Sequence, residues 1–214
     1  MKKISASQFR IFVETCRRTG REYGLLRCSS GNMSWRVDAE RMLVTATRSW
    51  LADLTEKQVV VLRTRDGAVL NGRKPSVEAG FHGGVLRARP DMNVVLHFQT
   101  PFATTLACRE DLEKINFFVI PEIPVYIGAI AIVPYIQPGS EPLATAVIAA
   151  MKSRNMAVLR NHGMVVVGVD FNDAIQKAVF FELACEIIVR AGKKLRPLPT
   201  KEIARIQRES GGSA

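Results

Sequence analysis

Cysteine is scarce in this sequence of 214 residues, and its four cysteines are widely separated. No two of them stand in the short Cys-x-x-Cys spacing of zinc-binding or redox motifs. Long apolar runs are also missing, since no stretch reaches the roughly 20 residues that a membrane-spanning helix needs. The first residues are basic but lack the apolar core of a secretory signal. We therefore expect a cytoplasmic protein with reduced thiols and no membrane contact.

Acidic residues are outnumbered by basic ones, and the net charge is +10. A positive surface favours anionic partners such as phosphate esters or nucleic acid. The basic residues are scattered, apart from Arg17-Arg18 and Lys193-Lys194, and no aromatic stripe or nucleic-acid motif accompanies them. The charge alone does not decide between a soluble surface and an anion-binding one, and we expect no nucleic-acid partner.

The hydrophobic pattern predicts one α/β domain over residues 1–195. Helices are predicted at about 5–23, 75–89, from 100 onwards, 140–154 and 172–191, and strands at 33–37, 42–47, 59–64, 93–98, 129–136, 156–160 and 164–169. The strands come as hairpins with helices between them, which indicates a mainly antiparallel central sheet covered by helices on both faces. Residues 196–214 form a basic tail ending in Ser and Gly, and we expect it to fray.

Two of the three histidines stand where a sheet presents reactive groups. His97 ends an apolar strand, and His162 lies in the tight turn between two other strands. Neutral imidazole is a good zinc ligand, so both side chains could bind one metal ion. They are far apart in the sequence, however, and two ordinary structural histidines are the alternative.

Glu78 stands in the first turn of the helix predicted from Pro75 and Ser76. A carboxylate there is stabilised by the helix dipole, and it is either a simple helix-start acid or a general acid/base beside a metal. His82, four residues later, shares a helix face with Glu78. It is either a packed partner or a spare metal ligand.

Two polar loops offer hydroxyls and backbone N–H groups. The first loop, Ser29-Ser30-Gly31-Asn32, precedes a predicted strand. The second runs from Thr45 through Thr47 to Arg48 and follows a predicted strand. Such loops bind anions, although Ser, Gly and Asn are also typical of ordinary turns.

Six segments, taken in order, resemble the class II aldolase/adducin family. They are SSGNMS at 29–34, MLVTAT at 42–47, KPSVEAGFH at 74–82, RPDMNVVLHFQ at 89–99, VPY with PGS within 133–140, and LRNHGMVVVG at 159–168. The resemblance spans roughly residues 8–190, and the most similar enzyme class is L-fuculose-phosphate aldolase. It implies a homotetramer with active sites between neighbouring subunits.

The resemblance also implies roles for particular residues. His97 and His162 match family zinc ligands, and Glu78 matches the catalytic acid/base, which also contacts the metal when substrate is absent. Asn32, Thr47 and Ser76 fall on positions that hold the substrate phosphate. The implied reaction is reversible aldol cleavage of a ketose 1-phosphate such as L-fuculose 1-phosphate, giving dihydroxyacetone phosphate and an aldehyde.

The sequence departs from the family at several site positions. Gln99 stands where a third histidine is expected, and an amide oxygen is a poorer zinc ligand that suits manganese or magnesium better. Arg48 replaces a glycine, where its guanidinium could bind phosphate or block the pocket, and Val77 replaces a serine. The tyrosine that family aldolases borrow from the neighbouring subunit cannot be placed in this sequence, and the nearest segment, INFFVIPE, has phenylalanines instead. The alternative is a non-catalytic, adducin-like oligomeric protein that has lost the full metal site.

Overall fold

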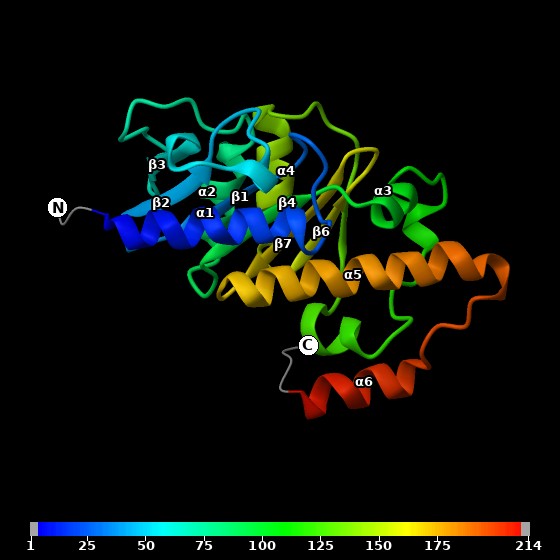
Figure 1. Cartoon of the computed structure of the whole chain (residues 1–214). Coiled ribbons are helices and arrows are strands. Elements are labelled where there is room, and N and C mark those ends of the chain that lie inside the picture. The colour runs from blue at the N-terminus through cyan, green and yellow to red at the C-terminus, as the bar shows by residue number, and fades with distance from the viewer. Residues whose placement is uncertain (1–3, 211–214) are drawn as a thin grey trace.

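A seven-stranded sheet forms the middle layer of the molecule in the computed structural model, which describes residues 4–210 (Figure 1). The strand order is β3-β2-β1-β4-β7-β6-β5, and all neighbouring pairs are antiparallel except β5 and β6. The strands are β1 (Asn32–Arg36), β2 (Arg41–Thr45), β3 (Val59–Arg63), β4 (Val94–Phe98), β5 (Ala131–Val133), β6 (Met156–Leu159) and β7 (Gly163–Gly168). The predicted mainly antiparallel sheet is confirmed.

Helices cover both faces of this sheet, as predicted. They are α1 (Ala6–Arg21), α2 (Ala79–Ala88), α3 (Pro101–Ala107), α4 (Glu141–Met151), α5 (Phe171–Ala191) and α6 (Thr200–Glu209). Helices α2 and α4 pack on one face and share a core with it, whereas α1, α3 and α5 share a second core with the other face. Figure 1 shows α1 and α5 crossing the side of the sheet nearer the viewer.

Alternation along β4 decides which side chains meet which helices. Val94, Leu96 and Phe98 belong to the core under α1 and α5, and Val95 belongs to the core under α2 and α4. Because side chains alternate along a strand, His97 faces the same side as Val95. The strand therefore directs His97 toward the start of α2.

Helix α2 begins later than predicted, at Ala79 rather than at Pro75 or Ser76. The preceding segment is held against the end of β2, where Ala46 bridges to Pro75 and the Ser76 N–H donates to the Thr45 carbonyl at 3.0 Å. Glu78 is consequently the residue before the first helical turn, with φ −97° and ψ 4°.

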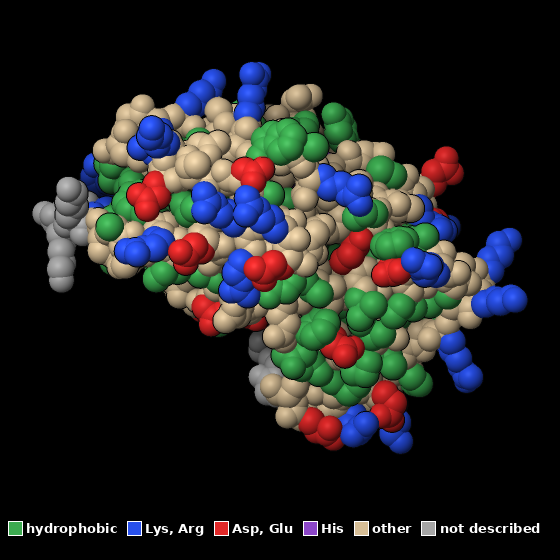
Figure 2. Space-filling view, in the orientation of Figure 1, with side chains coloured by type: hydrophobic (Ala, Val, Ile, Leu, Met, Phe, Trp, Pro, Cys, Tyr) green, Lys and Arg blue, Asp and Glu red, His purple; other side chains and the backbone are tan. Residues whose placement is uncertain are grey.

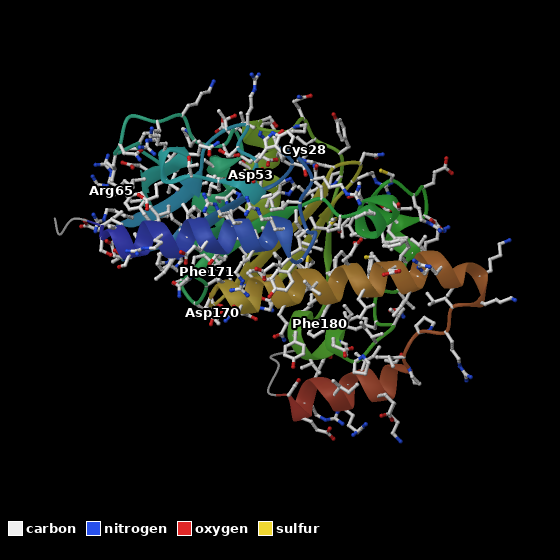
Figure 3. All side chains as sticks on the ribbon, viewed as in Figure 1. Cys28, Asp53, Arg65, Asp170, Phe171 and Phe180 are labelled. Atoms are coloured by element: carbon white, nitrogen blue, oxygen red, sulfur yellow. The ribbon has the colours of Figure 1, made fainter. Side chains whose placement is uncertain are left out.

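Strand β5 is also shorter than the predicted strand at 129–136. It ends at Val133 because Pro134 follows, and proline has no N–H for the ladder. A short π-helical turn, η4 (Ile123–Ile127), lies in the proline-rich segment before it, and its Tyr126 stacks on Phe180 of α5 at 5.4 Å between ring centroids (Figure 3).

The expectation that the tail frays is wrong for residues 200–209, which form α6. This helix packs against η4, and the Leu198 N–H donates to the Phe118 carbonyl at 2.8 Å just before it. These contacts, which the local composition does not reveal, hold the segment in place. The Gly-Ser end of the predicted tail, residues 211–214, lies outside the described residues.

Charged side chains of both signs are interspersed on the face shown in Figure 2. Arg21 pairs with Asp53 at 2.5 Å, and Arg160 pairs with Glu113 at 2.5 Å. The Lys and Arg side chains are spread over this face and do not form one continuous stripe. Among the helices of residues 4–210, none has the length and apolar character needed to cross a membrane.

Candidate active site

A cleft of about 320 Å³ lies where β1 begins, β2 and β4 end, and β6 turns into β7. Its walls carry hydroxyl, amide and basic side chains, and one end carries a carboxylate between two imidazoles. The lining residues are Ser29, Ser30, Gly31, Asn32, Ala46, Thr47, Arg48, Ser49, Ser76, Val77, Glu78, His97, Gln99, Pro138 and His162. Cys28, labelled in Figure 3, directly precedes this lining and marks its place in the molecule.

Glu78, His97 and His162 converge at one end of the cleft, with one ligand atom of each within 4.8 Å of the others. Glu78 Oε2 lies 3.6 Å from His97 Nε2, and Glu78 Oε1 lies 3.4 Å from His162 Nε2. Glu78 and His97 are buried. Two imidazole nitrogens and a carboxylate are a donor set that divalent cations such as zinc accept.

The hydrogen bonds around this cluster leave its lone pairs facing one another. His97 Nδ1 lies 2.9 Å from the Met164 carbonyl, which can only accept, so Nδ1 carries the proton and Nε2 presents a lone pair to Glu78. Glu78 Oε1 is buried and has no hydrogen-bond partner among residues 4–210. A cation between these atoms would satisfy the unpartnered oxygen, so the residues present fit a divalent metal.

The electrostatics keep His162 in its metal-binding form. Burial, aided by the neighbouring His97, lowers the pKa of His162 to about 4, and the Glu78 carboxylate opposes this shift only in part. The imidazole is therefore neutral at pH 7, which is the state that coordinates metals.

The turn between β6 and β7 brings His162 to β4. Asn161 adopts a left-handed conformation with φ 53°, and its N–H donates to the Ala107 carbonyl at 3.0 Å. A Cβ at Gly163 would lie 2.8 Å from the Phe98 carbonyl oxygen and 3.0 Å from His97 Cε1. Only glycine allows this close approach, which places the two imidazole rings 4.8 Å apart.

Gln99 also lies at this end of the cleft. It follows His97 by two residues, so it continues the same side of β4, and its Cγ would be 2.8 Å from a Cβ at Gly163. The side chain lines both the cleft and a neighbouring cavity of about 660 Å³. Gln99 therefore lies beside His97 and Gly163 in the cleft.

The same cleft gathers the residues predicted to bind phosphate. Asn32, Thr47, Arg48 and Ser76 all line it. Arg48 is exposed and has φ 58°, a left-handed conformation that favours glycine and costs a side chain roughly 1 kcal/mol. Arginine at this strained position places a permanent positive charge at the mouth of the cleft.

Ser49 lines the cleft as well, although no motif in the sequence predicts it. Its hydroxyl is buried and has no hydrogen-bond partner in the part of the chain that the structure describes. The only signal for it in the sequence is its place directly after Arg48. Val77, which replaces a family serine, is 61% exposed and adds an apolar wall instead of a hydroxyl.

His82 does not reach the cleft and is not a spare ligand of the cluster. It is fully buried, with Nδ1 2.7 Å from Ser34 Oγ and Nε2 against Asn32 Oδ1. Asn32 in turn donates from Nδ2 to Glu78 Oε2 at 2.7 Å. Of the two roles considered for His82, that of a packed partner agrees with the structure.

The chain is similar to known proteins over most of its length. The model of the class II aldolase and adducin N-terminal domain matches residues 10–189. A 3-oxo-tetronate 4-phosphate decarboxylase from Haemophilus influenzae is 32% identical, over 85% of this chain and 88% of its own. An L-fuculose phosphate aldolase from Methanocaldococcus jannaschii is 30% identical, over 80% of this chain and 90% of its own.

A solved structure agrees with these sequence matches. The crystal structure of YgbL from Escherichia coli, described as a candidate aldolase, epimerase or decarboxylase, superposes with a TM-score of 0.88 at 26% identity. The superposition covers 94% of this chain and 98% of that one. As its motifs predict, the chain belongs to the class II aldolase and adducin family.

Proposed function

We propose that this chain is a divalent-metal-dependent lyase that breaks the bond between the α- and β-carbons of the ketone in a small phosphorylated keto acid or ketose. The observation that carries the proposal is the cluster of Glu78, His97 and His162 in a cleft that hydroxyl and amide side chains and Arg48 also line. The cluster suits the reacting carbonyl, and Arg48 with the hydroxyl side chains suits a phosphate group.

Two candidate substrates give the same fragment. Loss of the carboxylate of 3-oxo-tetronate 4-phosphate yields carbon dioxide and, after protonation, dihydroxyacetone phosphate. Cleavage of L-fuculose 1-phosphate yields dihydroxyacetone phosphate and L-lactaldehyde. In both reactions negative charge develops on one three-carbon phosphate, and a bound divalent metal would stabilise that charge as a Lewis acid.

The residues of the chain supply binding and proton transfer. Asn32, Thr47 and Ser76 provide donors for phosphate oxygens, and Arg48 provides a charged fork. Glu78 is the only carboxylate among the described cleft-lining residues, and it delivers a proton to the carbon from which the bond has broken.

We favour decarboxylation as the first candidate. Aldol cleavage must also remove a proton from the hydroxyl of the leaving half, for which family aldolases use a tyrosine of the neighbouring subunit. That tyrosine has no placed counterpart in this chain, and the nearest segment has Phe117 and Phe118. Carbon dioxide leaves without any such proton transfer, and the similarity to a 3-oxo-tetronate 4-phosphate decarboxylase supports the same choice.

The test is a direct comparison of the two substrates. Purified protein supplemented with zinc, manganese or cobalt is given each phosphate, and dihydroxyacetone phosphate is followed by its coupled reduction with NADH. We expect chelator-sensitive release from the keto acid. Release from L-fuculose 1-phosphate alone would assign aldol cleavage. Release from neither would leave the non-catalytic, adducin-like alternative.

Gln99→His should tighten the binding of zinc. An imidazole would replace a weak amide oxygen beside His97 and His162, and we expect at least a tenfold gain in affinity, about 1.4 kcal/mol. Calorimetric titration of the metal-free protein with zinc and manganese measures it. An unchanged zinc affinity would mean that residue 99 does not face the metal. A gain in affinity that is larger for zinc than for manganese would support a native site in which Gln99 contributes an oxygen ligand beside the two imidazoles.

Arg48→Gly should weaken substrate binding without weakening the fold. Glycine at position 48 relieves the strain of the left-handed backbone. This gain roughly offsets the conformational entropy that glycine loses on folding, which costs about 1 kcal/mol. Loss of a charged hydrogen bond to phosphate costs about 1.5 to 3 kcal/mol, so KM should rise about 10- to 100-fold. Arg65→Ala, which removes an equal charge away from Cys28 and the cleft (Figure 3), is the matched control. An equal rise in KM in both variants would mean that the net charge of the protein, and not a contact of Arg48 with phosphate, causes the effect.

We also infer a cytoplasmic homotetramer with the cleft near a subunit boundary, as the family resemblance suggests. Apolar side chains gather around α5, η4 and α6 on the face shown in Figure 2. Tyr126 of η4 and Leu183 of α5 are 42% and 43% exposed. Light scattering on the purified chain measures the assembly, and a monomer at micromolar concentration would contradict it.

A further inference from the structure

A buried chain of hydrogen bonds ends on the Glu78 carboxylate. It begins at Ser34 of β1, whose Oγ lies 2.7 Å from His82 Nδ1. His82 Nε2 contacts Asn32 Oδ1, and Asn32 Nδ2 reaches Glu78 Oε2 at 2.7 Å. Ser34 and His82 are inaccessible to solvent, and Asn32 and Glu78 are only 7% and 6% exposed. Water therefore does not compete for these bonds.

The direction of the chain follows from its chemistry. The carboxylate of Glu78 accepts, so Asn32 must turn its Nδ2 toward it and its Oδ1 toward His82. An amide oxygen only accepts, so His82 Nε2 carries the ring proton. His82 Nδ1 is then an acceptor, and the Ser34 hydroxyl donates to it. Each donor thus points toward Glu78.

The amide of Asn32 has one further N–H, and the residue lines the cleft. It can therefore contact a bound substrate while it holds Glu78. This arrangement depends on His82, because an unrestrained amide can turn its oxygen toward Glu78. Two acceptors would then face each other, and the carboxylate would be pushed out of line with the imidazoles.

We propose that His82 is a positioning residue that, by fixing the amide of Asn32, holds the Glu78 carboxylate toward His97 and His162. The inference rests on the proposed function, in which Glu78 serves the metal and the reacting carbon. His82 itself contacts neither. Its stacking on Phe81, at 4.7 Å between ring centroids, offers the competing explanation that it only fills space in the core.

Two substitutions separate these explanations. His82→Gln can place an amide N–H near the position of Nε2 and keep the donor to Asn32, whereas His82→Phe keeps the ring and the packing but removes the donor. Second-layer partners of metal sites typically contribute 10- to 100-fold to affinity or activity, so we expect His82→Phe to lose about 10- to 100-fold in both kcat and manganese affinity. His82→Gln should recover most of each.

The measurements are calorimetric titration of each metal-free variant with manganese and steady-state kinetics with the substrate that the wild type accepts. If His82→Phe does not fold, His82→Asn, whose shorter amide reaches toward Ser34 but not Asn32, replaces it. Wild-type values in His82→Phe, or equal losses in His82→Gln and the variant without the donor, would overturn the positioning role.

The outcomes also separate this inference from the proposed function. A wild type that binds manganese but cleaves neither substrate removes the proposed activity, and the metal affinities of the variants still decide the role of His82. If the wild type cleaves a substrate and His82→Phe has the same kcat and manganese affinity, only the positioning role is overturned. A wild type that binds no divalent ion overturns both.

Discussion

Glu78→Gln should lower kcat by about 100- to 10,000-fold at saturating metal, the usual contribution of a general acid/base. Glutamine has nearly the same shape, and its amide oxygen can still accept the hydrogen bond from Asn32 Nδ2. It cannot exchange a proton at neutral pH, however. Saturating metal separates the loss of proton transfer from any loss of a ligand, and thermal unfolding verifies that the fold is intact.

Glu141→Gln is the matched control. Glu141 is an exposed acid in the first turn of α4, so it tests whether any carboxylate at a helix start has such an effect. We expect full activity from it. If Glu78→Gln kept more than about a tenth of wild-type kcat, Glu78 would not be the general acid/base, and the acid at the start of α2 would be only a helix-start carboxylate.

The elements that carry the site could be predicted because their signals are local. An apolar run ending at His97 and followed by Thr100-Pro101 marks a strand and the next helix, and these are β4 and α3. The Asn161-His162-Gly163 turn is likewise a short-range signal. The start of α2 could not be predicted from a short-range signal. It is delayed by the bridge between Ala46 and Pro75, which joins segments far apart in the sequence.

The site itself was predictable only in part. Spacing alone does not relate His97 to His162. Their positions at strand ends allow a shared metal site, and the family resemblance supplied the stronger argument that they converge. The link from His82 to Glu78 needed the register of β1 on β4, in which Asn32 pairs with His97, and the placement of α2 over that face. Such contacts depend on how two sheet strands and a helix pack together, so no local pattern in the sequence reveals them.

Acid should destabilise the protein through His82. Burial, with a smaller contribution from nearby His97, lowers the pKa of His82 to about 3, whereas the unfolded chain keeps the ordinary value near 6.5. Between these values the unfolded state binds a proton that the folded state excludes. The stability contributed by neutral His82 is therefore complete above pH 6.5 and falls by about 1.4 kcal/mol per pH unit below it.

His82→Gln isolates this effect, because glutamine keeps the donor to Asn32 but does not titrate. Urea unfolding at a fixed protein concentration, at several values between pH 7 and pH 4, gives the free energy of unfolding of both proteins. The difference between wild type and variant should shift by roughly 3 kcal/mol over that range in favour of the variant. Parallel curves would show that His82 takes up a proton in the folded state as readily as in the unfolded one. The burial of His82 would then not restrain its charge.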